Sequence, residues 1–188
     1  MSAFENIVVM MNERNQEIEK IKLKYMTEMQ AEFNNAAKAF FEACPGVQAI
    51  AWTQYTPYFN DGDPCVFSVG ELYFVVAGFD ADNLPTPYEF EDDGVYTTLP
   101  CPDYTGDTYP EMLVHWREYK KTNNASWCDS TISDIEYAIE HFSGYDKKIK
   151  QFKELITNNE DLLESMYGDG VAVYLTPNGV IVNEYDHD

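Results

Sequence analysis

Residues 171–185 read VAVYLTPNGVIVNEY, in which two runs rich in β-branched residues enclose Pro177, Asn178 and Gly179. An Asn-Gly pair between two such runs is the strongest short-range signal for a β-hairpin. The stretch therefore predicts strands over 171–176 and 180–185. We expect this hairpin to share one antiparallel sheet with strands from the other end of the chain.

Those other strands are expected between residues 48 and 77. Strand-like runs over 48–55 and 65–69 flank the turn-rich segment TPYFNDGDP, and a third run over 71–77 follows Gly70. Short runs rich in β-branched and aromatic residues, separated by turn formers, are typical of antiparallel strands. We interpret this region as a meander, which gives a sheet of about five strands.

The N-terminal region predicts one long helix over 1–44. Ser2 and Glu5 have the spacing of a capping box, and Pro45 predicts that the helix ends near residue 44. Apolar residues recur at the intervals of one helical face, at Phe4, Met11, Ile18, Tyr25, Met29, Phe33, Ala36 and Phe40.

A helix of this length would span roughly 60 Å, which is too long for a compact domain of this size to cover. Its N-terminal half must therefore project, bend near residues 12–15, or pair with another copy. Met11, Ile18 and Tyr25 fall seven residues apart, so they predict a seam for a homodimer.

An irregular acidic segment and several helices are expected between the strands. Residues 80–108 contain four prolines and many turn formers without a sustained apolar period. Helices are then expected after the capping-box pair Thr108 and Glu111, after Ser130 or Thr131, and over 147–156 and 160–167. The predicted fold class is α+β, a single domain over 1–188 in which helices cover one face of an antiparallel sheet.

Charge is the most unusual property of the chain. The formal net charge is −21, and no Lys or Arg occurs between Lys38 and Arg117 although 13 carboxylates do. The residues after Lys153 also lack cations and carry eight carboxylates. Such segments cannot neutralise themselves, so their field projects into solvent or meets the cations of a partner. The charge disfavours direct binding to nucleic acid or to anionic membranes.

A candidate docking face follows from the spacing of these acids. Proteins that bind DNA carry arrays of Lys and Arg that contact its closely spaced phosphates, and carboxylates at similar density suit the same arrays. Loop tyrosines beside carboxylates suit an interface in which arginines pair and stack. The candidate partner-binding residues are Glu89, Glu91, Asp92, Asp93, Asp103, Asp107, Glu111, Tyr88 and Tyr104. The alternative is that the acids only keep the protein solvated.

Enzymatic motifs have little support. The chain contains no G-x-G-x-x-G, P-loop, G-x-S-x-G or H-E-x-x-H pattern, and His115 and His141 lie on predicted helices without a second histidine at i+3 or i+4. We predict no catalytic residues, no cofactor and no metal site.

The loop at 60–65 is the one place where an alternative remains open. Asn60 to Asp63 resembles a calcium loop, but Ser68 stands where an EF-hand needs its closing glutamate. We interpret the loop as a turn built by Asn, Asp and Gly. The alternative is a small metal-dependent or thiol enzyme that uses residues 60–65.

The cysteines indicate a reducing compartment. They are scattered singly, with no C-x-x-C pair, at Cys44, Cys65, Cys101 and Cys128. The first residues lack the features of a secretory signal, and no apolar run approaches ~20 residues. We expect free thiols and a cytoplasmic protein.

Residues 52–67, WTQYTPYFNDGDPCVF, resemble a segment of small, uncharacterised acidic proteins of tailed bacteriophages. The resemblance implies a protein made in the cytoplasm of an infected bacterium, where small acidic proteins often inhibit host or defence factors. We therefore expect a non-enzymatic acidic interaction protein, an inhibitor or nucleic-acid mimic that docks on a basic, nucleic-acid-binding protein.

Overall fold

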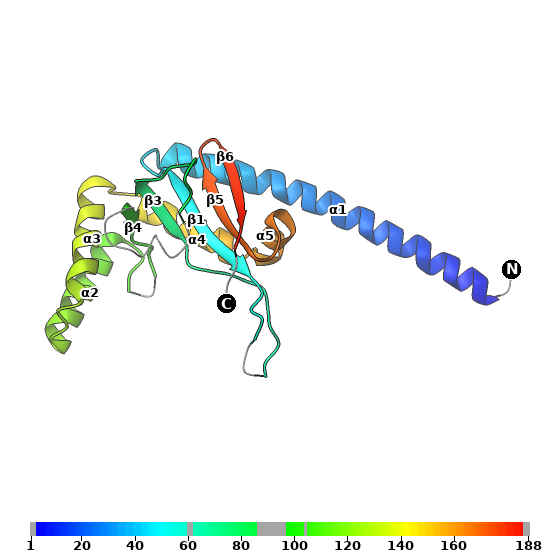
Figure 1. Ribbon diagram of the computed structural model, residues 1–188, viewed down its shortest axis with the longest axis horizontal. Helices are drawn as coiled ribbons and strands as arrows, with labels where there is room; N and C mark the ends of the chain where they lie inside the picture. The colour runs from blue at the N-terminus through cyan, green and yellow to red at the C-terminus, as the bar shows by residue number, and fades with distance from the viewer. Residues whose placement is uncertain (1–2, 60–61, 86–96, 104, 186–188) are drawn as a thin grey trace. The chain divides into compact units, whose positions relative to one another are not determined.

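The computed structural model describes residues 3–59, 62–85, 97–103 and 105–185. Within these ranges the chain forms five helices and six strands that make one antiparallel sheet, which confirms the α+β class (Figure 1). The chain divides into two compact units, Met1–Ala36 and Ala37–Asp188. We call them the helical unit and the globular unit, and we describe each by itself.

The long N-terminal helix is confirmed. Helix α1 runs over Ala3–Ala43 and continues without interruption through residues 12–15. Its last turn belongs to the globular unit, where the Cys44 amide donates to the carbonyl of Phe40 at 2.8 Å. The chain then turns at Pro45, because proline cannot continue the helical hydrogen-bond pattern. Ser2 of the expected capping box lies outside the described residues.

The sheet has the strand order β4-β3-β1-β5-β6, and β2 also pairs with β1. Its strands are β1 (Ala49–Tyr55), β2 (Ser68–Val69), β3 (Tyr73–Ala77), β4 (Thr97–Leu99), β5 (Val171–Thr176) and β6 (Gly179–Glu184). The predicted β5–β6 hairpin is present, but it closes at the pair Thr176 and Gly179. Pro177 and Asn178 therefore form its turn, and Gly179 is the first residue of β6 rather than a turn residue. The chain thus joins strands from both of its ends in one sheet.

The meander interpretation was wrong. Strands β2 and β3 do not pair with each other; both pair with β1, through Gln54 with Val69 and through Ala51 with Tyr73. The register shifts by one residue between these pairs, so 68–77 is one strand interrupted by a bulge. At this bulge a Cβ on Gly70 would lie 2.6 Å from the Thr53 hydroxyl oxygen, which explains the glycine.

Strand β4 lies inside the segment 80–108, which we expected to be irregular throughout. Phe74 of β3 pairs with Leu99 of β4, and the register shifts between Val75 and Ala77. Only three residues form the strand. A run this short carries no periodic signal of its own, so pairing with β3 decides its conformation.

The four remaining helices are α2 (Tyr109–Asn123), α3 (Cys128–His141), α4 (Asp146–Thr157) and α5 (Glu160–Tyr167). All four were predicted, but α3 begins before Ser130, whose hydroxyl donates to the carbonyl of Trp127 at 3.4 Å. Helix α2 begins after Thr108 without a hydrogen bond from that side chain. The buried carboxylate of Asp146 instead accepts from the amide of Tyr109 at 3.1 Å. An acid from α4 therefore satisfies the first turn of α2.

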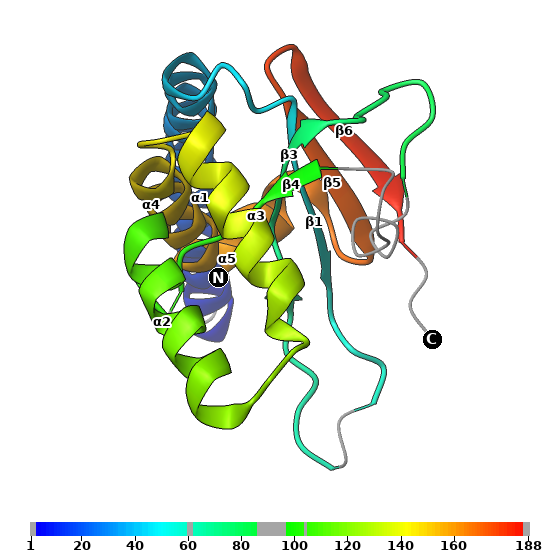
Figure 2. The ribbon, with the colours of Figure 1, turned by 90° about the vertical axis from the view of Figure 1, so that its left-hand side faces the viewer.

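Helices cover one face of the sheet, as predicted. Figure 2 shows α2, α3 and α4 together on one side of the strands. On this face the ring of Phe40 lies 5.7 Å from that of Phe74 and 4.9 Å from that of Phe152. The opposite face carries the small residues Ala49 and Ala51, and the segment 79–85 packs against it through residues such as Phe79 and Leu84.

The buried side chain of Gln54 links the sheet to α5. Its carbonyl oxygen accepts from the indole N–H of Trp52 at 3.1 Å. Its amide nitrogen donates to the carbonyls of Leu163 at 3.1 Å and Gly168 at 2.6 Å. Both N–H donors and the carbonyl acceptor of this fully buried amide thus have hydrogen-bond partners, which offsets the cost of burying the side chain.

Candidate protein-binding surface

The structure brings the two cation-free segments of the chain together. All six strands and α5 derive from residues 39–116 and 154–188, which contain no Lys or Arg. Strand β1 of the first segment pairs with β5 of the second over five residue pairs, from Ile50 with Leu175 to Gln54 with Val171. The whole sheet is therefore free of cationic side chains.

The net charge is divided unevenly between the two units. The helical unit has six acidic and four basic residues, or −2, whereas the globular unit has 27 acidic and eight basic residues, or −19. The eight cations of the globular unit all lie on helices. They are Lys38 at the end of α1, Arg117, Lys120 and Lys121 on α2, and Lys147, Lys148, Lys150 and Lys153 on α4.

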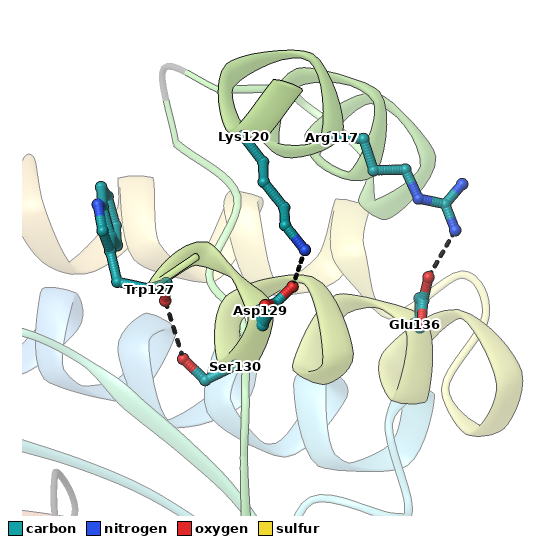
Figure 3. A network of polar contacts seen from close by, with 6 residues as sticks. All are labelled: Arg117, Lys120, Trp127, Asp129, Ser130 and Glu136. Atoms are coloured by element: carbon teal, nitrogen blue, oxygen red, sulfur yellow. Dashed lines mark hydrogen bonds and ion pairs between the residues drawn. The ribbon is translucent and has the colours of Figure 1, made fainter. Parts of the chain in front are cut away.

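Several of these cations are neutralised locally. Figure 3 shows Arg117 and Lys120 of α2 directed toward Glu136 and Asp129 of α3, with which they form ion pairs. Lys150 binds Asp107, and this hydrogen bond raises the pKa of the Lys150 amine. The paired acids therefore belong to the helical layer or to the loop before α2.

We call the six strands, together with the described parts of segments 56–85 and 168–185, the sheet side. None of its exposed carboxylates takes part in an ion pair among the described residues. These carboxylates are Asp63, Glu71, Asp80, Asp82, Asp169 and Glu184. Asp169 accepts from the amide of Thr56 at 2.7 Å and Asp80 from the amide of Asp82 at 3.0 Å, but no cationic side chain of the described residues neutralises these acids, so the sheet side projects a negative field into solvent.

Three of the predicted docking residues gather around the start of α2. Asp103, Asp107 and Glu111 are all exposed. Asp103 accepts from the amide of Thr105 at 2.7 Å, and Glu111 accepts from the amide of Asp107 at 3.0 Å. Asp107 also binds Lys150. Each of the three carboxylates therefore stabilises the loop before α2 or its packing on α4 through one of its oxygens. None of them is free to serve only a binding partner.

The other predicted docking residues lie outside the described residues. They are Tyr88, Glu89, Glu91, Asp92, Asp93 and Tyr104. The list of candidate residues was drawn only from residues 88–111, so it left out the acids of the sheet side. The lack of cations on both segments, which were already expected to share one sheet, was the signal that could have added them.

The described part of the 60–65 loop contains a glycine in a turn conformation. Gly62 has a φ of 98°, which favours glycine, and Asp63 and Cys65 are exposed. Asn60 and Asp61 lie outside the described residues. Among the residues that the structure describes, no group of three or more His, Cys, Asp or Glu side chains is arranged to hold a metal ion.

The four cysteines are free thiols. Burial raises the pKa of Cys101 to about 11, and the nearby acids Asp103 and Glu71 add to that shift. Cys44 and Cys128 are buried, whereas Cys65 is exposed. A thiol with a raised pKa stays protonated at neutral pH and is a poor nucleophile, so Cys101 is not activated.

An aromatic cluster lies where α2 meets α3. The rings of Trp116, Tyr119 and Trp127 lie 5.8 to 6.0 Å apart, each edge-on to the others. Trp127 is 62% exposed. At these separations the three rings pack edge-to-face against one another and form a partly exposed apolar patch.

The surface of the described residues is hollowed in two places that bear on the charge distribution. The first, of about 440 Å³, lies between α2 and α3 and includes Arg117, Lys120 and Asp129, which are engaged in the ion pairs described above. The second, of about 310 Å³, lies beside Lys38, Phe41 and Pro177. Neither of these two hollows includes an acid of the sheet side.

The described helices include none that is long and apolar enough to cross a membrane. Comparisons of the chain with protein-family models, with characterised proteins and with solved structures found no match.

Proposed function

We propose that this chain is a non-enzymatic acidic interaction protein that docks its sheet side on a basic surface of another protein. The partner is a protein whose Lys and Arg side chains normally bind nucleic acid, and the chain acts as its inhibitor by occupying that surface. One observation carries the proposal. The six strands and α5 contain no Lys or Arg, while all eight cations of the globular unit lie on other helices.

The segregation of charge argues against a purely solubilising role. A surface that only keeps a protein soluble works with both signs interspersed. Here the cations of α2 and α4 form ion pairs with Glu136, Asp129 and Asp107, whereas the exposed acids of the sheet side have no such partners in the described part of the chain. An uncompensated field of one sign attracts a basic protein and accelerates its association.

The resemblance of residues 52–67 to phage proteins fits the same proposal. In that setting the partner is a host or defence factor in the bacterial cytoplasm. Inhibitors that occupy a nucleic-acid-binding surface must compete with duplex DNA, which carries about one charge per 1.7 Å of axis. If duplex DNA displaces this chain from its partner, the chain is a nucleic-acid mimic; a general binder of basic proteins would not need to share the DNA-binding surface.

The test is affinity capture from a bacterial lysate with wild type and two variants of equal charge change. The sheet-side variant carries Asp63→Lys, Asp82→Lys and Glu184→Lys. The control carries Glu118→Lys, Glu140→Lys and Glu154→Lys, three exposed acids of α2, α3 and α4. We expect wild type and the control to capture the same basic protein, and the sheet-side variant to lose it.

Salt and DNA provide two further readouts of the same capture. High salt should release the partner, because contacts between exposed charges are screened beyond ~8 Å at physiological ionic strength. Added duplex DNA should displace it from wild type. Equal capture by both variants would refute the assignment of the sheet side, and capture that DNA leaves unchanged would refute mimicry.

A further inference from the structure

The helical unit exposes an unusual number of large apolar side chains. Ten of them, all between residues 4 and 25, are 41 to 74% exposed. They are Phe4, Ile7, Val8, Val9, Met10, Met11, Ile18, Ile21, Leu23 and Tyr25. A helix with an apolar stripe gains stability by burying it against another surface. Contiguous exposed apolar residues on this scale indicate an interaction site.

Six of the ten follow a seven-residue repeat. With Phe4 at position a, the a positions are Phe4, Met11, Ile18 and Tyr25, and the d positions are Ile7, Arg14, Ile21 and Glu28. Val8 and Met10 flank this stripe at e and g, whereas Val9 and Leu23 lie on the outer face at f. A sustained a/d pattern of this kind is typical of a two-stranded coiled coil.

We infer that residues 4–28 form a parallel, in-register coiled coil with the same segment of a second copy of this chain. This inference concerns the helical unit and is independent of docking by the sheet side. We assign the apolar stripe to a contact with another copy because, when the two helices run in the same direction, each a position meets the same a position of the second copy and each d position meets the same d position. At positions g and e the charges of Glu17 and Lys22 complement one another in that orientation and not in its reverse.

Charge decides the direction of the second helix. In a parallel pair, position g of one helix faces position e of the following heptad on the other, so Glu17 faces Lys22 of the second copy and the pair occurs twice by symmetry. In the antiparallel register that overlaps residues 4–28 in full, Glu17 faces Glu17. Within one chain Lys22 lies 3.0 Å from Glu19, an exposed pair that contributes little and can exchange.

Arg14 and Glu28 interrupt the stripe at d positions. A polar residue inside an apolar seam weakens a coiled coil but specifies its register and its number of strands. Arg14 is long enough to bury its methylenes and carry its guanidinium to solvent. In register the two Arg14 side chains form one polar layer, whereas a shift by one heptad would place each against an apolar residue.

A membrane surface is a poorer occupant for the same stripe. Helices that lie on membranes carry many Lys and Arg on their polar face, which attracts anionic lipids. The helical unit has a net charge of −2, and the globular unit attached to it carries −19. Both charges oppose approach to an anionic surface.

Sedimentation equilibrium of the full chain, from micromolar to hundreds of micromolar, tests the pairing. Wild type should have the mass of a dimer, and Ile18→Asp should raise the dissociation constant about 100-fold or more, because it places two charges in one apolar layer. Leu23→Asp is the matched control, since it adds the same charge on the outer face. A monomeric wild type, a trimeric or larger mass, or equal weakening by both variants would overturn the inference.

Charge exchange tests the parallel direction. Glu17→Lys and Lys22→Glu should each weaken the dimer about threefold to tenfold, and the double variant should recover most of the loss. An antiparallel pair would instead gain from Glu17→Gln, which removes the repulsion between two Glu17 side chains, whereas Glu17→Lys would only replace it with repulsion between two lysines. Ile7→Cys, with Cys65 and Cys101 replaced by serine, should oxidise to a covalent dimer only if the helices are parallel.

Salt and vesicles separate this inference from its competitors. Added salt should strengthen the dimer, because it screens the repulsion between two chains of −21, whereas it should weaken docking on a basic partner. Because salt affects them in opposite directions, loss of dimerisation can be distinguished from loss of docking on the basic partner. Cosedimentation of monomeric wild type with lipid vesicles, abolished by Ile18→Asp, would instead assign the stripe to a membrane surface.

Discussion

Replacing Gln54 with leucine tests how firmly the two cation-free segments are joined. Gln54 of β1 is fully buried, and its amide bonds to Trp52, to Leu163 and to Gly168. Leucine keeps most of the volume but removes all three hydrogen bonds. The measurement thus isolates the polar contribution of the link between β1 and α5.

The expected loss follows from the groups left without partners. The indole N–H of Trp52 belongs to a fully buried residue and loses its acceptor, whereas the carbonyl of Leu163 lies within α5 and keeps its helical partner, and the carbonyl of the partly exposed Gly168 can bind water. One buried orphan costs about 1–3 kcal/mol, so the variant should lose about that much unfolding free energy. For a chain of this size that lowers Tm by roughly 2–12 °C.

Urea denaturation followed by circular dichroism measures the loss. Gln151→Leu is the control, because it makes the same substitution at an exposed position of α4 and should change stability by less than about 0.5 kcal/mol. Adding Trp52→Phe to Gln54→Leu removes the orphaned donor, so the double variant should cost less than the sum of the single changes. A loss for Gln54→Leu no larger than that of Gln151→Leu would refute this account of the link.

Three further predictions concern the bulge, a buried thiol and the acidic loop. Gly70→Ala should destabilise the protein by about 1–3 kcal/mol in urea denaturation, because its Cβ would meet the Thr53 hydroxyl at 2.6 Å, and wild-type stability would contradict the close approach. Stability should fall between pH 9.0 and about 11, since burial raises the pKa values of both Cys101 and Cys44 from 9.0 to about 11 and their neutral thiols favour the fold only below that window. Cys101→Ala should remove the Cys101 share of this slope and leave that of Cys44; an unchanged slope would assign it to other groups. Reversing Glu91, Asp92 and Asp93 to lysine should slow association with the basic partner, and an unchanged on-rate would remove this segment from the docking face.

Local signals in the sequence predicted most of the elements correctly. The Asn178-Gly179 pair predicted the hairpin, and apolar periodicity with Pro45 predicted where α1 ends. These signals work because turn geometry and helical periodicity depend on residues close in sequence. The same is true of the start of α2 after Thr108.

The features that sequence reasoning missed depend on contacts between distant residues. Strand β4 exists because Leu99 pairs with Phe74, and the placement of β2 and β3 along one edge of β1 depends on the bulge at Gly70. The first turn of α2 is satisfied by Asp146, which lies 37 residues further along the chain. No local pattern contains this information.

The same limit applies to the candidate surface. The sequence revealed two segments without cations and predicted that strands from both share one sheet, but it did not reveal that β1 pairs directly with β5. Candidate residues were nevertheless chosen from one segment only. Asp103, Asp107 and Glu111 shape the start of α2, while Asp82 and Glu184, on the sheet side, were overlooked.

The rate of association with the captured basic protein tests the central claim most directly. Stopped-flow measurements over a range of salt would compare wild type with the sheet-side variant and the helix-side control, which change charge equally. Electrostatic steering accelerates association by about 10–1,000-fold, so we predict a roughly tenfold or larger loss at low salt for the sheet-side variant, a wild-type rate for the control, and convergence of all three at high salt. Equal slowing of both variants would contradict the claim that the sheet side is the docking surface.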